Sequence, residues 1–331
     1  MIFEKQSIFE FDPEHPHCHC SVIQELSNGE LMAVWYAGKA EAHKSVGLKA
    51  SWKKIKEPDS KWSPPKLIYK TPSRPDGNEI IIEHEGKIHM IFNTIFGQLF
   101  PWTKTHLFYT YSEDFGRSWK QPIQISDKKG YTVRTKPLKI IRQNQSSLFI
   151  IPMGFERITK CSSRMLITED FKSFQFSEEI WLEKWMNIQP AITQLPNGKI
   201  MAFLRTDMNH IYRTYSDDLG HSWSKPEKLQ LYNPNSALDF VLTTDKKLVL
   251  VWNNNPRKGQ IMQSRKCLNI GLSEDFGDTW KIIKEIEKDP VDGRFEYPAI
   301  IYGSDSLFHL TYTNRRKNIR YVKFDLEWLL S

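Results

Sequence analysis

Three stretches of the chain repeat one pattern: SEDFGRSW at residues 112–119, SDDLGHSW at residues 216–223 and SEDFGDTW at residues 273–280. A looser copy, TEDFKSF, occupies residues 168–174. In a tight turn of this kind, Ser and Asp side chains bond nearby backbone groups, and Gly adopts a conformation that a side chain would disfavour. The pattern therefore predicts a recurring hairpin turn with the Trp packed beneath it. We assign its Asp residues a structural role and no catalytic one.

A second pattern runs in step with the first, and it consists of a polar turn that enters an apolar strand. Its six copies begin at residues 28, 85, 146, 197, 245 and 305, and the first reads NGELMAVW. Each copy is typical of a hairpin turn followed by a buried strand. Self-similarity at a period of about 55 residues indicates a repeat architecture. The sequence thus predicts one all-β domain over residues 1–331, a β-propeller of six blades.

The repeats resemble a known family. The three strict copies are similar to the Asp-boxes of the sialidase superfamily, which lie on the outer blade turns of six-bladed propellers. The whole series resembles the bacterial sialidase-like proteins with BNR/Asp-box repeats, over essentially the entire chain. The stretches that carry the resemblance are residues 18–21, 35–41, 135–137, 188–190, 204–206, 233–239, 296–299 and 312–316. This resemblance implies a sialidase-like propeller that acts on or binds a glycan.

The chain departs from the sialidase pattern at three places. HPHCHC at residues 15–20 replaces the Arg-Ile-Pro signature of the first blade. Gln189 stands where a sialidase supplies the carboxylate that activates its Tyr, and Ser45 replaces an acidic residue of the relatives' first blade. We therefore do not expect sialidase activity in the strict sense.

Polar residues recur where the innermost strand of each predicted blade starts and where the next strand ends. These two points emerge on the same face because the two strands are antiparallel neighbours. The residues are His17, His19, Tyr36, Glu41, Asn78, Glu79, Asn93, Lys136, Glu156, Gln189, Arg205, Asn235, Ser236, Asp239, Asn253, Asn255, Glu296, Tyr297, Arg315 and Arg316. They predict a polar, glycan-sized site at the axial mouth of the propeller.

Roles follow from the chemistry of these side chains and from the resemblance. Arg suits bidentate capture of a carboxylate, which favours Arg205 and Arg315 as anchors for an acidic sugar. In sialidases a Tyr in the corresponding blade is the nucleophile, which implies that role for Tyr297. Further binding candidates are Lys136, Gln189, Asn235 and, by ring stacking in the loop at residues 96–102, Trp102. Acid/base candidates are Glu41, Asp239, Glu296 and His19. Trp181 and Trp185, just before the fourth blade, are expected to shape the rim.

Three functions fit such a site. The first is an exo-acting glycoside hydrolase, which needs a general acid and a carboxylate or Tyr nucleophile. The second is a polysaccharide lyase acting on a uronate-containing glycan. This chemistry does not require the carboxylate that Gln189 replaces. The third is a propeller that binds a glycan without catalysis. We favour the hydrolase.

Composition limits the partners and cofactors. The net charge of +7 favours anionic partners, but the Lys residues are scattered, so we expect an acidic glycan and no nucleic acid. No apolar stretch is long enough for a membrane helix.

His15, His17 and His19 alternate along the chain, as metal ligands on a strand could. No second ligand pair accompanies them, so we expect no metal or other cofactor. The N-terminus shows no signal-peptide pattern, which predicts a cytoplasmic protein.

Overall fold

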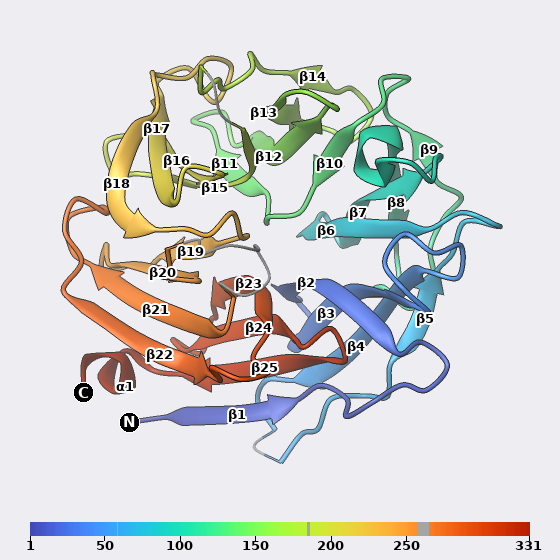
Figure 1. Cartoon of the computed structure of the whole chain (residues 1–331), viewed down its shortest axis with the longest axis horizontal. Helices are drawn as coiled ribbons and strands as arrows, with labels where there is room; N and C mark the ends of the chain where they lie inside the picture. Colours follow the sequence, from blue (N-terminus) through green and yellow to red (C-terminus); the bar gives the residue numbers. More distant parts are fainter. Residues whose placement is uncertain (58, 184–185, 257–264) are drawn as a thin grey trace.

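A computed structural model describes residues 1–331 except 58, 184–185 and 257–264. Six antiparallel sheets surround a common axis (Figure 1). The prediction of a six-bladed β-propeller is confirmed. Apart from a short 3-10 turn, η1 (Pro101–Lys104), the helical structure among the described residues is one short helix, α1 (Leu326–Leu330).

Each blade runs outward from the axis in chain order. Blade one holds β2 (His17–Glu25), β3 (Glu30–Gly38), β4 (Gly47–Lys54) and β5 (Lys66–Tyr69). Blade two holds β6 (Asp76–His84), β7 (Lys87–Ile95), β8 (Thr105–Ser112) and β9 (Ile123–Gln124). Blade three holds β10 (Tyr131–Val133), β11 (Leu138–Ile141), β12 (Ser147–Glu156), β13 (Cys161–Thr168) and β14 (Gln175–Phe176).

The other three blades follow the same order. Blade four holds β15 (Asn187–Gln194), β16 (Ile200–Thr206), β17 (His210–Ser216) and β18 (Glu227–Tyr232). Blade five holds β19 (Asp239–Leu242), β20 (Leu248–Trp252), β21 (Cys267–Ser273) and β22 (Ile282–Lys288). Blade six holds β23 (Phe295–Tyr302), β24 (Phe308–Asn314), β25 (Asn318–Phe324) and, at its outer edge, β1 (Phe3–Ser7).

The ring is closed by strand pairing between the two ends of the chain. The N-terminal strand β1 pairs with β25 from Phe3 opposite Phe324 to Ser7 opposite Arg320. The two termini therefore lie close together, as Figure 1 shows. The first strand of the chain thus completes the blade that is otherwise made from its last residues, which closes the ring.

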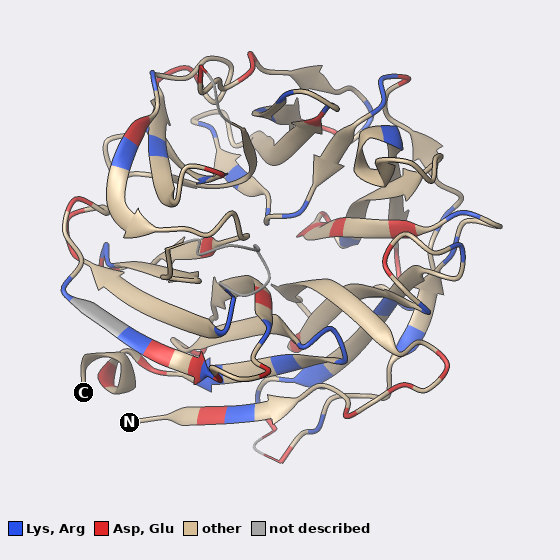
Figure 2. Cartoon of the chain, viewed as in Figure 1, with Lys and Arg blue, Asp and Glu red and all other residues tan. Residues whose placement is uncertain are grey.

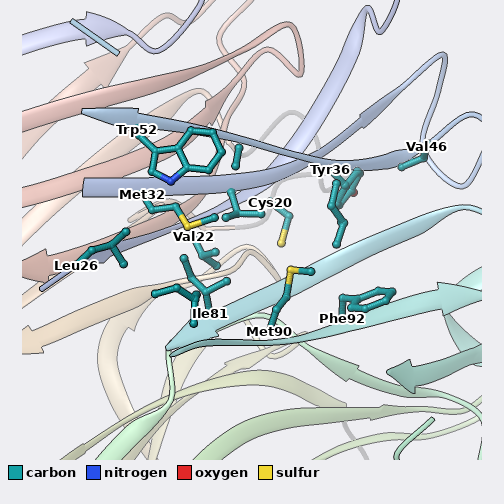
Figure 3. Close-up of a cluster of buried hydrophobic side chains, with 14 residues drawn as sticks. Cys20, Val22, Leu26, Met32, Tyr36, Val46, Trp52, Ile81, Met90 and Phe92 are labelled. Carbon is teal, nitrogen blue, oxygen red and sulfur yellow. The ribbon is translucent and has the colours of Figure 1, made fainter. Parts of the chain in front are cut away.

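The hydrophobic core lies between neighbouring blades. In one cluster, Val22 and Met32 of blade one meet Ile81 and Met90 of blade two, with Trp52 at its edge (Figure 3). Both faces of each sheet are covered, so strands such as β16 are apolar almost throughout. This packing fixes the inner strands, whose ends carry the polar residues of the mouth.

The Asp-box turns have the predicted structural role. In the first, the Ser112 hydroxyl donates to Asp114 at 2.7 Å and accepts from the Gly116 amide at 2.8 Å, while the Ser118 amide donates to Asp114 at 2.8 Å. Although partial burial works in the opposite direction, hydrogen bonds from Ser118 and Ser112 lower the pKa of Asp114 to about 2. Each box joins the third strand of a blade to the outermost one, away from the axis.

Candidate functional site

A recurring backbone irregularity aims side chains at the axis. Near the start of the innermost strand, five blades carry a non-glycine residue with φ between 50° and 61°: Cys20, Asn78, Gln189, Asn235 and Tyr297. In four of these blades the pairing register shifts at that point, which marks a β-bulge. A bulge inserts one residue and redirects the side chain beside it. Left-handed backbone is costly for such residues, and it clusters where function requires it.

Three of these positive-φ residues meet around one guanidinium group. Arg205, at the end of β16, donates from Nε to Asn235 Oδ1 at 2.8 Å. Its Nη1 donates to Gln189 Oε1 at 2.6 Å and to the Tyr297 phenol oxygen at 3.0 Å. The Gln189 amide also donates to that phenol oxygen, at 3.2 Å. Arg205, Gln189 and Asn235 are buried and Tyr297 is partly exposed, so the phenol is the part of this network that faces the mouth.

Beside Tyr297, the carboxylate of Glu296 is enclosed by three guanidinium groups. Glu296 accepts from Arg265 at 2.5 Å and from the Nε atoms of Arg294 and Arg316, each at 2.9 Å. Although burial works against it, the positive charges of Arg316, Arg265 and Arg294 lower the pKa of Glu296 to about 2. Glu296 was predicted as an acid/base. The structure gives it a permanently ionised side chain with no exposed surface, a geometry suited to positioning arginines.

Arg316 links this cluster to blade one. Its Nη1 donates to Glu41 and lies 3.4 Å from His17 Nε2. Burial raises the pKa of the Tyr36 phenol well above its usual value, so Tyr36 stays neutral and donates to Glu41 at 3.5 Å. The Glu41 side chain keeps about a third of its surface exposed, which leaves it accessible from the mouth.

His19 lies beneath the mouth and does not face solvent. Its ring packs against Tyr297 with 4.1 Å between centroids, and Nδ1 lies 3.1 Å from the Thr313 hydroxyl. Burial, followed by the charges of Arg316 and Arg265, holds the pKa of His19 well below its usual value. Its Nε2 is buried and has no hydrogen-bond partner among the described residues. The predicted acid/base is therefore a neutral ring that supports Tyr297 from below.

Glu156 is the carboxyl group at the mouth with the properties of a general acid. It ends β12, is partly exposed, and accepts from the Thr132 hydroxyl at 3.3 Å. Burial of the carboxyl raises the pKa of Glu156 to about 7, and the positive charge of Arg205 only partly opposes this. A carboxyl group that is half protonated near neutral pH can both donate and accept a proton. The sequence placed Glu156 at the mouth but gave it no role.

Lys136 and Asp239 lie deeper along the axis than predicted and do not join the Arg205 network. Lys136 Nζ lies 2.6 Å from Asp239 and 2.7 Å from the carbonyl oxygen of Phe240. Asp239 also accepts from the Ile300 amide at 2.9 Å. Lys136 lines a cavity of about 700 Å³ formed by turns such as 24–27 and 83–86, at the opposite opening of the axis. The physical reason is that β10 begins at Tyr131, so Lys136 lies past the mouth.

Arg315 and Trp102 occupy the periphery of the mouth. Arg315 is 44% exposed and pairs with Asp289, while its neighbour Arg316 turns inward. Trp102 is partly buried, with its ring 6.4 Å from that of Tyr36. Trp181 lies at the rim between blades three and four, and Trp185 lies outside the described residues.

The floor of the site contains two further buried ionisable groups. Arg134 bridges blades by donating to the carbonyl oxygens of Leu238, at 3.0 Å, and Pro298, and its guanidinium lies 5.2 Å from the Tyr297 ring centre. Burial raises the pKa of Glu79 well above its usual value, so this carboxyl is neutral. Neither Glu79 oxygen has a partner among the described residues.

Two arginines of the site, Arg265 and Arg294, had been given no role in the predicted site. Arg265 immediately precedes β21, the third strand of blade five, and its second terminal nitrogen donates to the Asn235 carbonyl at 2.7 Å. The third strand of a blade starts on the same face where the second strand ends. Including these starts in the search for polar residues would have found Arg265.

Over the part of the chain that the structure describes, no three His, Cys, Asp or Glu side chains are grouped so that they could hold a metal ion. The Nδ1 atom of His15 lies 3.2 Å from a carboxylate oxygen of Asp12. No described helix is long and apolar enough to cross a membrane. Lys/Arg and Asp/Glu positions are interspersed around the six blades (Figure 2).

Solved structures share this architecture at low sequence identity. A Dyadobacter fermentans protein of unknown function is 16% identical with a TM-score of 0.74, covering 97% of this chain and 98% of its own. The Hadza microbial sialidase Hz136 is 14% identical with a TM-score of 0.81, and the alignment covers 98% of this chain and 69% of the sialidase. The NanB sialidase of Streptococcus pneumoniae is 13% identical with a TM-score of 0.76, with coverages of 98% and 71%. These likenesses show the fold.

A search of curated proteins found no match. A family model described as a BNR repeat-like domain matches residues 29–310, which is most of the chain and includes blades two to five in full. The chain belongs to the BNR repeat-like domain family.

Proposed function

We propose that this protein is an exo-acting glycoside hydrolase that removes an acidic sugar from the end of a glycan. The observation that carries the proposal is the contact between the partly exposed Tyr297 phenol and the Arg205 guanidinium at the centre of the mouth. The positive charges of Arg205 and Arg294 suit a sugar carboxylate, because guanidinium groups bind carboxylates in a bidentate manner. Gln189 and Asn235 hold Arg205 in place through its Nη1 and Nε atoms.

The proposed reaction uses Tyr297 as nucleophile and Glu156 as acid/base. The Tyr297 oxygen bonds to the anomeric carbon as its proton leaves to water, and hydrogen bonds from Arg205 and Gln189 stabilise the oxygen. The glycosidic bond breaks, and the departing oxygen takes the proton of Glu156. Water then attacks the anomeric carbon, gives a proton back to Glu156, and displaces Tyr297, whose oxygen regains a proton from water. The sugar leaves with its original anomeric configuration.

A polysaccharide lyase is the second candidate, and the amide of Gln189 favours it. A lyase removes the proton next to a uronate carboxylate, and it needs cationic or amide groups to neutralise that carboxylate. Arg205 and Gln189 meet at the Tyr297 oxygen, which could move that proton. No carboxylate beside the Tyr is required for this chemistry.

The test is a screen of purified protein against sialyllactose and short oligomers of hyaluronan, alginate and polygalacturonate. New reducing ends without absorbance at the unsaturated-uronate band, abolished by Tyr297→Phe, support the hydrolase. Absorbance that rises with the new ends favours the lyase, and binding without turnover favours a glycan-binding propeller. The control is Glu169→Gln, since Glu169 is an exposed residue of the loose Asp-box copy and pairs with Arg142.

Gln189→Glu separates the two enzymes further. In a hydrolase, the new carboxylate beside Tyr297 accepts the phenolic proton, so the rate is maintained or raised. In a lyase, the added negative charge opposes the uronate carboxylate, and the rate falls. Gln189 is buried and hydrogen-bonded to Arg205, so the substituted side chain keeps an ionic partner in the folded protein.

A further inference from the structure

A cavity opens outward from the mouth between blades three and four. It has a volume of about 260 Å³ and is lined by residues 157–161, Glu183, Met186 and Asp207. Arg157 directly follows the proposed acid Glu156, and Asp207 follows Arg205 by two residues. The cavity therefore lies beside the ends of β12 and β16, the strands that carry Glu156 and Arg205.

A second, larger cavity continues from the first. Its volume is about 620 Å³, within the range of about 300–1,000 Å³ that small-ligand pockets occupy. It is lined by residues 179–183, Met208, Tyr212 and residues 223–226. Glu183 lines both cavities, so the two cavities lie next to each other. We call the two cavities together the blade 3–4 groove.

The walls of the groove combine aromatic rings with polar groups. Trp181 is 37% exposed, and Trp223, the Asp-box Trp of blade four, is partly exposed beside it. The cations of Lys160 and Arg157 lie 3.6 Å and 4.8 Å from the centre of the Trp181 ring. Arg157 is held by Glu179 at 2.8 Å, so this arrangement is fixed in advance. Large flat rings with placed polar groups suit the apolar faces and hydroxyls of sugar rings.

We propose that the blade 3–4 groove binds the sugars that follow the terminal one, so that the substrate is a linear oligosaccharide of several residues. Only the identity of the sugar at the mouth rests on the proposed function; binding along the groove does not require turnover. Arg157 and Lys160 are accompanied in the cavity lining by Glu183 and Asp207, so this part of the groove offers donors and acceptors to the hydroxyls of a polar sugar chain. Trp181 provides the stacking platform beyond them.

The experiment measures binding in the Tyr297→Phe background, where the proposed reaction is blocked. Two-sugar and six-sugar oligomers of hyaluronan, alginate and α2,8-linked sialic acid are titrated by calorimetry. We expect at least one hexamer to bind about tenfold more tightly than its dimer. Trp181→Ala should remove about tenfold of hexamer affinity and leave dimer affinity within about twofold, while Trp181→Phe retains most of the hexamer affinity. Tyr232→Ala, which removes a 43% exposed ring that does not line the groove, is the matched control.

Binding along the groove is contradicted if hexamers bind no more tightly than dimers. It is also contradicted if Trp181→Ala weakens the binding of dimers and hexamers equally. Turnover by the wild-type chain separates this failure from failure of the proposed function. If hexamers bind in a Trp181-dependent manner without turnover, binding along the groove is supported and the hydrolase proposal is contradicted. If dimers and hexamers are turned over equally and Trp181→Ala has no effect, the hydrolase proposal is supported and binding along the groove is contradicted.

Discussion

Two features repeat around this propeller, and they repeat in different ways. In the outer Asp-box turns both the backbone and the side chains recur: Phe115, Leu219 and Phe276 have φ of 56°, 59° and 58°, each followed by a glycine. The Ser and Asp hydrogen bonds recur with lengths that agree to within about 0.1 Å. The same turn has to be made each time, and the same residues make it.

At the inner bulges the backbone recurs while the side chains differ from blade to blade. The residues with positive φ there include Cys20, Asn78, Gln189, Asn235 and Tyr297. A turn that only has to close a hairpin needs one solution, whereas an asymmetric sugar needs a different group from each direction. Recurrence of side chains thus indicates structure, and recurrence of geometry with varied side chains indicates a site.

The largest expected effect is that of Tyr297→Phe. Removing a nucleophilic oxygen lowers kcat by a factor on the order of 10⁴ in the proposed reaction. The ring remains packed on His19, so the free energy of unfolding should change by less than about 1 kcal/mol. Single-turnover kinetics and urea unfolding check the two parts. A variant that retains more than about a tenth of the activity contradicts the nucleophile assignment.

Glu296→Gln should destabilise the fold by about 3–5 kcal/mol, because it leaves Arg265, Arg294 and Arg316 without their shared counter-charge. Lowering the Glu296 pKa from 4.5 to about 2 corresponds to about 3 kcal/mol of stability. Since the folded-state pKa lies below the unfolded one, this stability is present above about pH 4.5 and is lost as the pH falls towards 2. Urea unfolding should therefore give a free energy of unfolding that is much lower for Glu296→Gln than for the wild type at pH 7, and the difference between the two proteins should be smaller at pH 3. A deficit that is independent of pH would argue against the ionised Glu296.

Glu156→Gln should lower kcat/KM by about 10²-fold on a natural glycan, the usual contribution of a general acid. If Glu156 is the acid, wild-type activity falls as the pH rises through about 7. The pH–activity profile of the variant should lack this decrease. An aryl glycoside with a good leaving group needs less protonation, so the variant's loss should shrink on it. Glu169→Gln, an exposed carboxyl of the same blade, is the control. An unchanged pH profile in Glu156→Gln rules out the acid role.

The fold could be predicted because its determinants are local and repeated. Each Asp-box carries its own hydrogen bonds within eight residues, and even the loose copy at 168–174 keeps Asp170 bonded to the amides of Lys172 and Ser173. The buried strand after each turn signal is likewise a short-range pattern. Closure by β1 was not predicted, since pairing of Phe3 with Phe324 leaves no trace in the local sequence.

The site could be predicted only in part, because side-chain direction depends on the bulges. Arg205, Gln189, Asn235 and Tyr297 do converge, whereas Lys136 pairs with Asp239 lower on the axis. In the pair at residues 315–316, both with positive φ, the inward arginine is the second, and the sequence does not distinguish them. The raised pKa of Glu156 arises from burial among three-dimensional neighbours, which spacing along the chain cannot reveal.

The smallest expected effect is that of Asp218→Ala in the Asp-box of blade four. Asp218 accepts from the Ser222 amide at 2.9 Å, the Ser222 hydroxyl at 2.6 Å and the Ser216 hydroxyl at 2.7 Å. Loss of such a turn-capping carboxylate should lower the free energy of unfolding by about 1–2 kcal/mol and leave kcat/KM unchanged. The matching change at Asp275 should cost the same, and the double variant the sum, because the two turns lie in different blades. Urea midpoints and kinetics on one glycan measure both. A loss of activity in the folded Asp218→Ala protein would mean that the outer repeat contributes to function, and the distinction between the two repeats would fail.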